Sequence, residues 1–215
     1  MNMETRNFNP TVIEEGLGAL LIGACIAFRP LLRPWYSRWG AADDEVEKPL
    51  PGDDHVPQPN LQTTRAITIQ APIEAVWPWV VQMGQGRGGL YSYERLENLA
   101  GCQMVNADRI LPEHQDLKAG DKFRIMVEGS GPAFDVLAVE PGQALILGGD
   151  EPPTSWGFIL EAIDERSTRL YARFRQNFEP TFGNTLMWRV FTEPISFVMG
   201  RKMLQGIKVR AEANC

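Results

Sequence analysis

The chain has 215 residues, 44% of them hydrophobic and 22% charged, which is sufficient for one folded domain with an appendage. Its net charge of −6 argues against wholesale nucleic-acid binding. Cys25, Cys102 and Cys215 are far apart and form no CxxC pair, and only two histidines are present. We therefore expect no disulfide scaffold, no metal site and no cofactor.

An apolar segment near the amino terminus gives the first functional signal. Gly16–Phe28 contains no charged residue, but as a helix it would reach only about 20 Å, short of a hydrocarbon core of roughly 30 Å. Extension to Thr11–Leu32 gives about 33 Å. The segment predicts a single-pass helix in the cell (inner) membrane. A buried helix of a soluble domain is the alternative, and whether residues 12–32 span the membrane or lie on it stays open.

Arginines and aromatic residues follow this segment, as in an interfacial belt. The belt is Arg29, Arg33, Trp35, Tyr36, Arg38 and Trp39. Because positive residues favour the cytoplasmic side, we expect the carboxy-terminal domain in the cytoplasm. A cleaved signal peptide is disfavoured because the residues before the apolar run lack net positive charge.

Small residues recur on one face of the apolar helix, at Ala19, Gly23 and Ala27. In a bilayer such a face lets another transmembrane subunit approach closely. The plainer interpretation is an apolar helix that happens to contain small residues.

A proline-rich acidic segment separates residues 1–40 from the domain at 64–215. Residues 41–63 contain four prolines and six acidic residues, a composition that predicts an extended linker. Asp53, Asp54 and His55 suggest a solvated acidic turn rather than a metal site, because no second ligand cluster matches them.

The domain begins with a strand at Thr64–Gln70 and a helix that starts at Ala71-Pro72. Ile73, Val76 and Val80 form its apolar stripe, and Pro78 should kink it.

A glycine-rich loop comes next and formally matches GxGxxG. It follows a helix rather than a strand, so a dinucleotide site is not expected. We predict a mobile gate to a ligand cavity, formed by Gly84, Gly86, Arg87, Gly88 and Gly89. A short helix is expected at Tyr91–Leu99.

The rest of the chain alternates with period two and then ends in a helix. The expected strands are 121–128, 133–140, 144–149, 155–163 and 168–178, and the helix runs from Thr192 to about Ala213. In the last strand Arg169, Tyr171, Arg173 and Arg175 share one face. A solvated outer face is the expected role of this row, with a docking surface for anionic lipid as the alternative.

This order of elements resembles the helix-grip fold of the SRPBCC, or START-like, superfamily, which includes polyketide cyclase/dehydrase-like proteins. The likeness is carried by residues 67–101, 106–121 and 193–212, above all by A-P-x-E-A-V-W at Ala71–Trp77. A closer likeness, to uncharacterised bacterial members, lies in the motifs at Arg33–Trp35, Arg38–Gly40, Asp44–Val46 and Pro49–Asp53. The resemblance implies an α+β fold whose curved antiparallel sheet wraps on a long carboxy-terminal helix, with a cavity between them.

Aromatic and methionine side chains are the expected lining of that cavity. They are Trp77, Trp79, Tyr91, Tyr93, Phe123, Trp156, Phe158, Phe174, Met199 and Met203. The leading hypothesis is a membrane-tethered domain that binds a lipid, quinone, pigment or polyketide-like molecule. The expected partners are membrane lipids, a hydrophobic small molecule and other transmembrane subunits.

Two alternatives remain. One is an accessory subunit of a membrane complex. The other is a cyclase/dehydratase-type enzyme, for which His114, Glu94, Asp108 and Arg109 are acid/base candidates. No nucleophile–base pair is visible in the sequence, so no catalytic residue is assigned.

Overall fold

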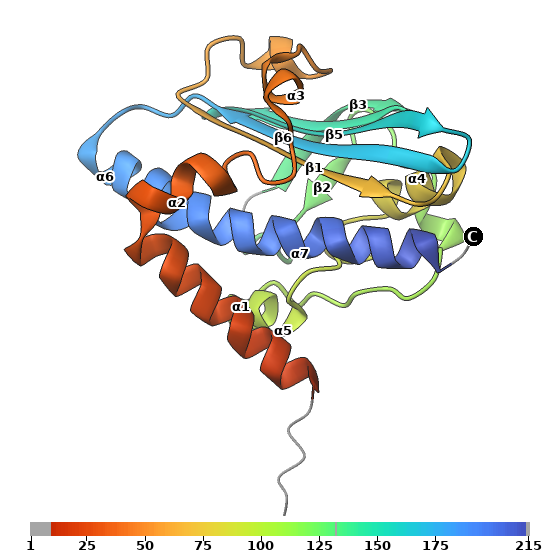
Figure 1. Cartoon of the computed structure of the whole chain (residues 1–215), viewed down its shortest axis with the longest axis horizontal. Helices are drawn as coiled ribbons and strands as arrows, with labels where there is room; N and C mark the ends of the chain where they lie inside the picture. Colours follow the sequence, from red (N-terminus) through yellow and green to blue (C-terminus); the bar gives the residue numbers. More distant parts are fainter. Residues whose placement is uncertain (1–9, 132, 214–215) are drawn as a thin grey trace, which may run out of the picture.

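The computed structural model describes residues 10–131 and 133–213. The described residues form a six-stranded antiparallel sheet in the order β1-β6-β5-β4-β3-β2. The strands are β1 (Leu61–Ile69), β2 (Lys122–Arg124), β3 (Ala133–Glu140), β4 (Ala144–Asp150), β5 (Pro153–Asp164) and β6 (Ser167–Gln176). Helix α7 (Glu193–Glu212) runs along one face of this sheet, as Figure 1 shows. The expected α+β architecture, a curved sheet on a long last helix, is confirmed.

The core lies between α7 and the inner face of the sheet. Alternating strand residues such as Leu145 and Leu147 of β4 point inward and are fully buried. From α7, Leu204 and Ile207 pack into the same cluster. The helix and the sheet therefore share one continuous apolar core.

Helices α4 (Ile73–Val81) and α5 (Glu94–Leu99) connect β1 to β2, with a short 3₁₀ turn, η2 (Pro112–His114), after them. The expected helix at Tyr91–Leu99 starts late because Tyr91 has a positive φ of 57°, which no helix accommodates. The expected strand at 121–128 is paired only as far as Arg124.

Two elements between β6 and α7 were not predicted. They are α6 (Phe182–Thr185) and η3 (Leu186–Thr192), a π-helical stretch that runs directly into α7. Neither buries a residue, so neither makes the core contacts that an apolar stripe predicts for a helix.

The amino-terminal segment folds into α1 (Pro10–Ala27) and α2 (Arg29–Tyr36). The expected continuous helix over Thr11–Leu32 is wrong, because the chain bends by 113° between the two helices. Pro30, in the first turn of α2, has no amide N–H to continue α1. Among the described residues no single helix has the length and apolar character to cross a bilayer, whereas α1 and α2 together satisfy both criteria.

Residues 41–60 lie against the outer face of the sheet. They include α3 (Asp43–Glu47) and the 3₁₀ turn η1 (Asp53–His55), and Figure 1 shows α3 on the side of the sheet opposite α7. Leu50 from this segment is 6% exposed and packs with Ile146, Ile159 and Tyr171. This segment is therefore folded onto the domain rather than extended.

Candidate functional site

The predicted cavity lining is a packed core in this structure. Trp79, Tyr91, Phe123 and Phe158 are each 1% exposed or less. Trp156 packs between Phe123, at 6.0 Å between ring centroids, and Phe158, at 4.9 Å. Large rings thus fill the space between sheet and helix, and their role as ligand lining stays a prediction.

The remaining residues of that predicted set are more scattered. Met203 is buried in the core and Trp77 packs on its edge, whereas Tyr93 lies against α1. Met199 accepts a hydrogen bond from Ser92 Oγ at its carbonyl oxygen, 2.9 Å away. Phe174 pairs with Trp156 across β5 and β6.

A buried glutamine, which the sequence analysis did not single out, organises the connection after α5. Gln82 Nε2 donates to Tyr91 Oη (3.0 Å) and to the Arg109 carbonyl (3.2 Å), and Gln82 Oε1 accepts the Leu111 N–H (2.9 Å). Tyr91 Oη donates in turn to the Trp79 carbonyl (3.1 Å). Burial raises the pKa of Tyr91 to about 12, so its hydroxyl stays a neutral donor.

The glycine-rich loop is a closed turn. Gly84 and Gly89 exchange two backbone hydrogen bonds, of 2.9 and 3.1 Å. Arg87 donates to the carbonyls of Val81 (3.3 Å) and His114 (2.6 Å), and burial lowers its pKa. Gly86, at the tip, is exposed. The loop does not border the groove described next, so its role as a gate stays a prediction.

A groove of about 1120 Å³ lies beside α7. Its walls come from α1 (Thr11, Glu14, Glu15), from the turn into α5 (Tyr91–Arg95), from α7 (Lys202, Gln205, Val209, Arg210) and from β1 (Ala66–Thr68). Arg210 stacks on the Tyr91 ring at 4.7 Å and donates through Nε to the Ala107 carbonyl at 2.8 Å. A groove with aromatic, aliphatic and charged walls suits an amphipathic molecule better than a wholly apolar one.

Helix α1 closes one side of this groove through polar contacts. Glu14 pairs with Lys202 of α7. The Glu15 carboxylate accepts the backbone N–H groups of Arg95 (3.2 Å) and Leu96 (3.3 Å). Below this contact Glu97 is 6% exposed, and burial, together with Glu94 and Glu15, raises its pKa to about 8.

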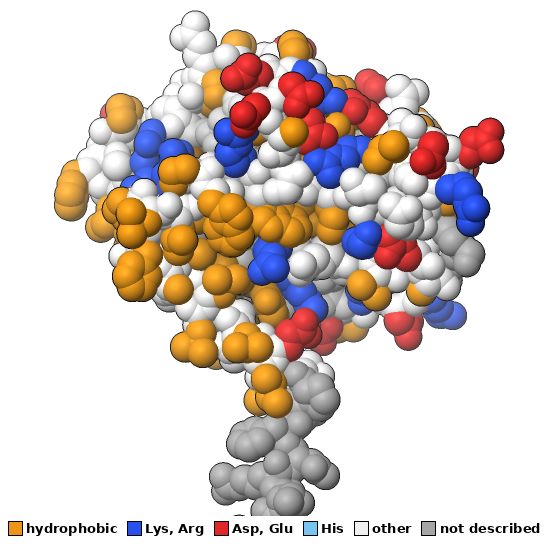
Figure 2. All heavy atoms as spheres, viewed as in Figure 1, with side chains coloured by type: hydrophobic (Ala, Val, Ile, Leu, Met, Phe, Trp, Pro, Cys, Tyr) orange, Lys and Arg blue, Asp and Glu red, His pale blue; other side chains and the backbone are white. Residues whose placement is uncertain are grey.

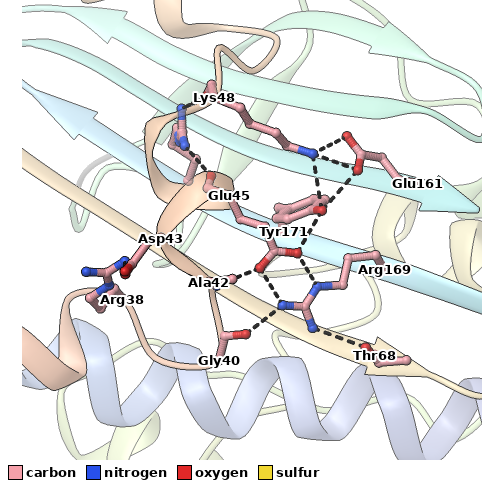
Figure 3. Close-up of polar contacts among 11 residues, drawn as sticks. Arg38, Gly40, Ala42, Asp43, Glu45, Lys48, Thr68, Glu161, Arg169 and Tyr171 are labelled. Carbon is pink, nitrogen blue, oxygen red and sulfur yellow. Dashed lines mark hydrogen bonds and ion pairs between the residues drawn. The ribbon is translucent and has the colours of Figure 1, made fainter. Parts of the chain in front are cut away.

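The arginine row on β6 is not a solvated face, and this expectation was wrong. Arg169 Nη2 pairs with Glu45 Oε2 at 2.7 Å, and Tyr171 Oη donates to Glu45 Oε1 at 3.0 Å. Lys48 pairs with Glu161 at 2.7 Å, as Figure 3 shows. The hydrogen bonds from Arg169 hold the pKa of Glu45 at about 2. Acidic residues of the 41–60 segment thus pair with the arginines on the outer face of the sheet.

The most buried arginine of the row is Arg173. Its guanidinium donates to the carbonyls of Glu45 (3.0 Å), Val46 (2.8 Å) and Lys48 (2.9 Å). Asp53 completes the set through its carboxylate. Because these partners occupy the arginines, the alternative of an anionic-lipid surface on this row is also wrong.

The predicted interfacial belt is partly a packing interface. Tyr36 is fully buried and stacks on Phe197 at 5.4 Å, and Trp39 lies under the Arg201 guanidinium at 5.4 Å. Arg38 pairs with the exposed Asp43. Of the three aromatic residues in the belt only Trp35 is largely exposed, at 48%.

A buried charge cluster fixes α2 to the domain. Glu193, at the start of α7, is 2% exposed and accepts from Arg33 Nε at 3.1 Å, with Arg29 at 3.7 Å. Arg65 of β1, which is 6% exposed, donates to the carbonyls of Tyr36 (3.3 Å) and Ser196 (3.1 Å). The sheet, α2 and α7 are therefore tied together at this end.

Exposed apolar side chains lie at the same end of the molecule and along α1, and we call this surface the apolar end. Figure 2 shows hydrophobic side chains over α6, α2 and α1. The apolar end comprises Val12, Ile13, Leu17, Leu20, Phe28, Leu31, Trp35, Phe182, Leu186, Met187, Phe191 and Ile195, each at least 40% exposed. Arg29 Nε donates to the Arg189 carbonyl at 2.7 Å, which joins α2 to η3. The predicted helix-packing residues Ala19, Gly23 and Ala27 are also exposed.

No protein-family model matches the chain, and no curated protein matches it significantly. Similar solved structures include a polyketide-cyclase-like protein from Corynebacterium glutamicum, with 17% identity over 71% of this chain and 91% of that chain and a TM-score of 0.41. An aromatase/cyclase from Streptomyces sp. R1128 has 13% identity over 72% of this chain and 94% of that chain, with a TM-score of 0.45. The self-sacrificing resistance protein CalC from Micromonospora echinospora has 13% identity over 71% of this chain and 95% of that chain, with a TM-score of 0.46. At such low identities and TM-scores these likenesses carry no argument about activity or ligand.

Proposed function

We propose that the chain is a membrane-associated domain that binds an amphipathic small molecule. The observation that carries this proposal is the apolar end, where α1, α2, α6 and η3 expose large hydrophobic side chains together. Soluble monomers rarely expose a contiguous apolar patch of this kind without a partner. The occupant we propose is the surface of a lipid bilayer.

Hydrophobic transfer favours this attachment. Full burial of a leucine or phenylalanine side chain contributes about 1.5–3 kcal/mol. Leu20, Leu31 and Phe182 are 72%, 79% and 85% exposed, so most of that contribution is still available to each. Partial insertion of only four such side chains would stabilise the bound state by roughly 3–6 kcal/mol, taking half the full value for each.

The charge beside the apolar end also favours a lipid bilayer as the partner. Arg29 and Arg33 share a single buried carboxylate, Glu193, so this seam keeps a net positive charge. Arg189, between the same apolar side chains, donates to the Asn60 carbonyl at 2.7 Å rather than to an acid. Basic side chains beside an apolar surface favour anionic lipid head groups. We accordingly place the protein at the cytoplasmic surface of the cell membrane, attached by a bent helix pair.

The groove beside α7 is the proposed place of the small molecule. One of its walls is α1, the helix whose Leu17 and Leu20 are exposed, so membrane attachment would bring the groove close to molecules dissolved in the bilayer. Aliphatic contact with Ile67 and Val209 and polar contact with Lys202 and Arg210 fit a ligand with a polar head. Lipid, quinone, pigment and polyketide-like molecules remain candidates.

Vesicle flotation of the full chain tests the attachment. We expect the protein to float with vesicles of mixed neutral and anionic phospholipid. The double variant Leu20→Gln/Leu31→Gln should lower the bound fraction at least tenfold. Ile163→Gln is the matched control, because Ile163 is also exposed, at 55%, but lies on β5 outside the apolar end. An equal loss in both variants, or no flotation of the wild type, would overturn the proposal.

A membrane protein partner is the second occupant that the apolar end would fit. It would be indicated if the chain fails to float alone yet co-purifies with one transmembrane partner, and loses it in Leu20→Gln/Leu31→Gln. No observation favours the cyclase/dehydratase interpretation. Of its acid/base candidates only Glu94 lines the groove, and Glu94 Oε2 already accepts the Asn106 N–H at 2.9 Å.

A further inference from the structure

Helix α1 is both a wall of the groove and a part of the apolar end. Thr11, Glu14 and Glu15 line the groove, while Leu17 and Leu20 are 60% and 72% exposed on the other side of the helix. The two roles conflict once the protein meets a bilayer, because a helix docked on the domain cannot place its whole apolar face in the membrane.

The contact between α1 and the domain changes character along the helix. At its amino-terminal half the contact is polar, through Glu14 with Lys202 and through Glu15 with two backbone N–H groups. Further along, Gly18 lies so close to the Tyr93 ring that a Cβ there would be 2.8 Å from it. Towards its carboxy-terminal end the contact is apolar, because Leu21, Ile22 and the fully buried Cys25 pack in one cluster with Phe197 and Val198 of α7.

We propose that α1 is a releasable strap, which leaves the domain when the protein binds a bilayer, lies in the membrane interface and opens the groove beside α7. This inference rests on the proposed membrane attachment and adds its regulation. The 113° bend at Phe28 is the hinge, since α2 stays anchored by Tyr36 and by the Arg33–Glu193 pair.

Release costs little at the polar contacts of the amino-terminal half of α1. An exposed ion pair such as Glu14–Lys202 contributes little to stability because water replaces each partner. Departure of α1 also moves Glu15 away from Glu97, whose buried Oε2 has no hydrogen-bond partner among the described residues. The Glu15 charge therefore disfavours ionisation of Glu97 only while α1 is docked.

Cys25 reports directly on the position of the strap. It lies on the face of α1 that packs against the domain and is fully buried there. It comes seven residues after Gly18 and lies on the side of the helix opposite Leu20. In a full chain with Cys102→Ser and Cys215→Ser it is the only thiol. When α1 lies on a bilayer with Leu17 and Leu20 inserted, the thiol faces water. We expect alkylation of Cys25 to be slow in buffer and at least tenfold faster on anionic vesicles.

Two glycines of α1 supply a matched pair of variants. Gly18→Val should push α1 away from Tyr93 and raise the alkylation rate at least tenfold in buffer alone. Gly23→Val places the same side chain on the same helix where nothing lies within 4 Å, and should leave the rate unchanged. Equal rates in the two variants would overturn the strap.

Flotation measured on the same samples separates the two proposals. Vesicle-bound protein whose Cys25 stays as protected as in buffer overturns the strap and leaves the membrane attachment standing. Protein that does not float overturns both. Fast alkylation in buffer without lipid overturns the docked state from which the strap is released.

Discussion

Arg173 and Asp53 form an ion pair with 2.7 Å between Nη1 and Oδ2, although 120 positions separate them in the chain. The arginine lies on β6 and the aspartate on η1, in the acidic segment outside the sheet. The pair makes this segment a covering layer on the outer face of the sheet.

Removal of the Arg173 side chain should destabilise the fold strongly. Arg173→Gln leaves Arg175 as the remaining ion-pair partner of Asp53 and leaves three carbonyls without a donor. Loss of one partner from a buried pair costs about 3–5 kcal/mol. Urea unfolding measures this, with Arg38→Gln as the control, because its partner Asp43 is exposed and such pairs contribute about 0–1 kcal/mol. Equal losses in the two variants would show that the acidic segment is not docked in solution.

Glu97 should make the stability of the domain fall as pH rises. Its pKa is about 8 in the fold against 4.5 ordinarily, so between these values the folded state holds a proton that the unfolded state lacks. The contribution of Glu97 to stability is therefore greatest at and below pH 4.5, and it declines as the pH rises to 8. Glu97→Gln should flatten the decline and raise Tm at pH 8 by about 4 °C or more. The exposed Glu113→Gln serves as control, and an unchanged pH profile in Glu97→Gln would contradict the assignment.

The polar contacts at the amino-terminal half of α1 should contribute modestly to the docking of this helix on the domain. Glu14→Gln removes the pair with Lys202, and loss of such an exposed pair should raise Cys25 alkylation in buffer about two- to fivefold. Glu128→Gln breaks a comparable exposed pair with Arg124, far along the chain from α1, and should leave the rate unchanged. A fall in the rate on Glu14→Gln would mean that this contact opposes docking.

Gln82 should hold the connection between α5 and β2 in place. Gln82→Leu leaves the Leu111 N–H and the Arg109 carbonyl without their partner, at a cost of about 1–3 kcal/mol for each unsatisfied buried group. Hydrogen exchange should accelerate over residues 106–115 and stay slow in β4. Uniform acceleration across the sheet would contradict a local role.

Sequence reasoning succeeded where a pattern is local. The alternation before Pro141-Gly142 placed β3 at Ala133–Glu140, and Glu193-Pro194 marked the start of α7. It failed where a partner is distant. The strand pattern predicts a solvated Arg173, but Asp53, from a segment distant in sequence, pairs with it. The composition around Tyr36 predicts an interfacial residue, but Phe197 of α7 stacks on its ring.

The candidate site shows the same limit. The aromatic residues were recognised, but whether rings line a cavity or fill it depends on packing between distant elements, as with Trp156 between Phe123 and Phe158. The groove could not be predicted, since its walls come from α1, α5, α7 and β1 and their approach is set by contacts such as Glu15 with Leu96.

Hydrogen–deuterium exchange of the full chain with anionic vesicles tests the membrane attachment most directly. The account predicts slower exchange in α2, α6 and η3, which carry a large part of the apolar end, and unchanged exchange in α3 and β6 on the opposite covered face. Protection centred on α3 and β6, or no protection anywhere in bound protein, would contradict it.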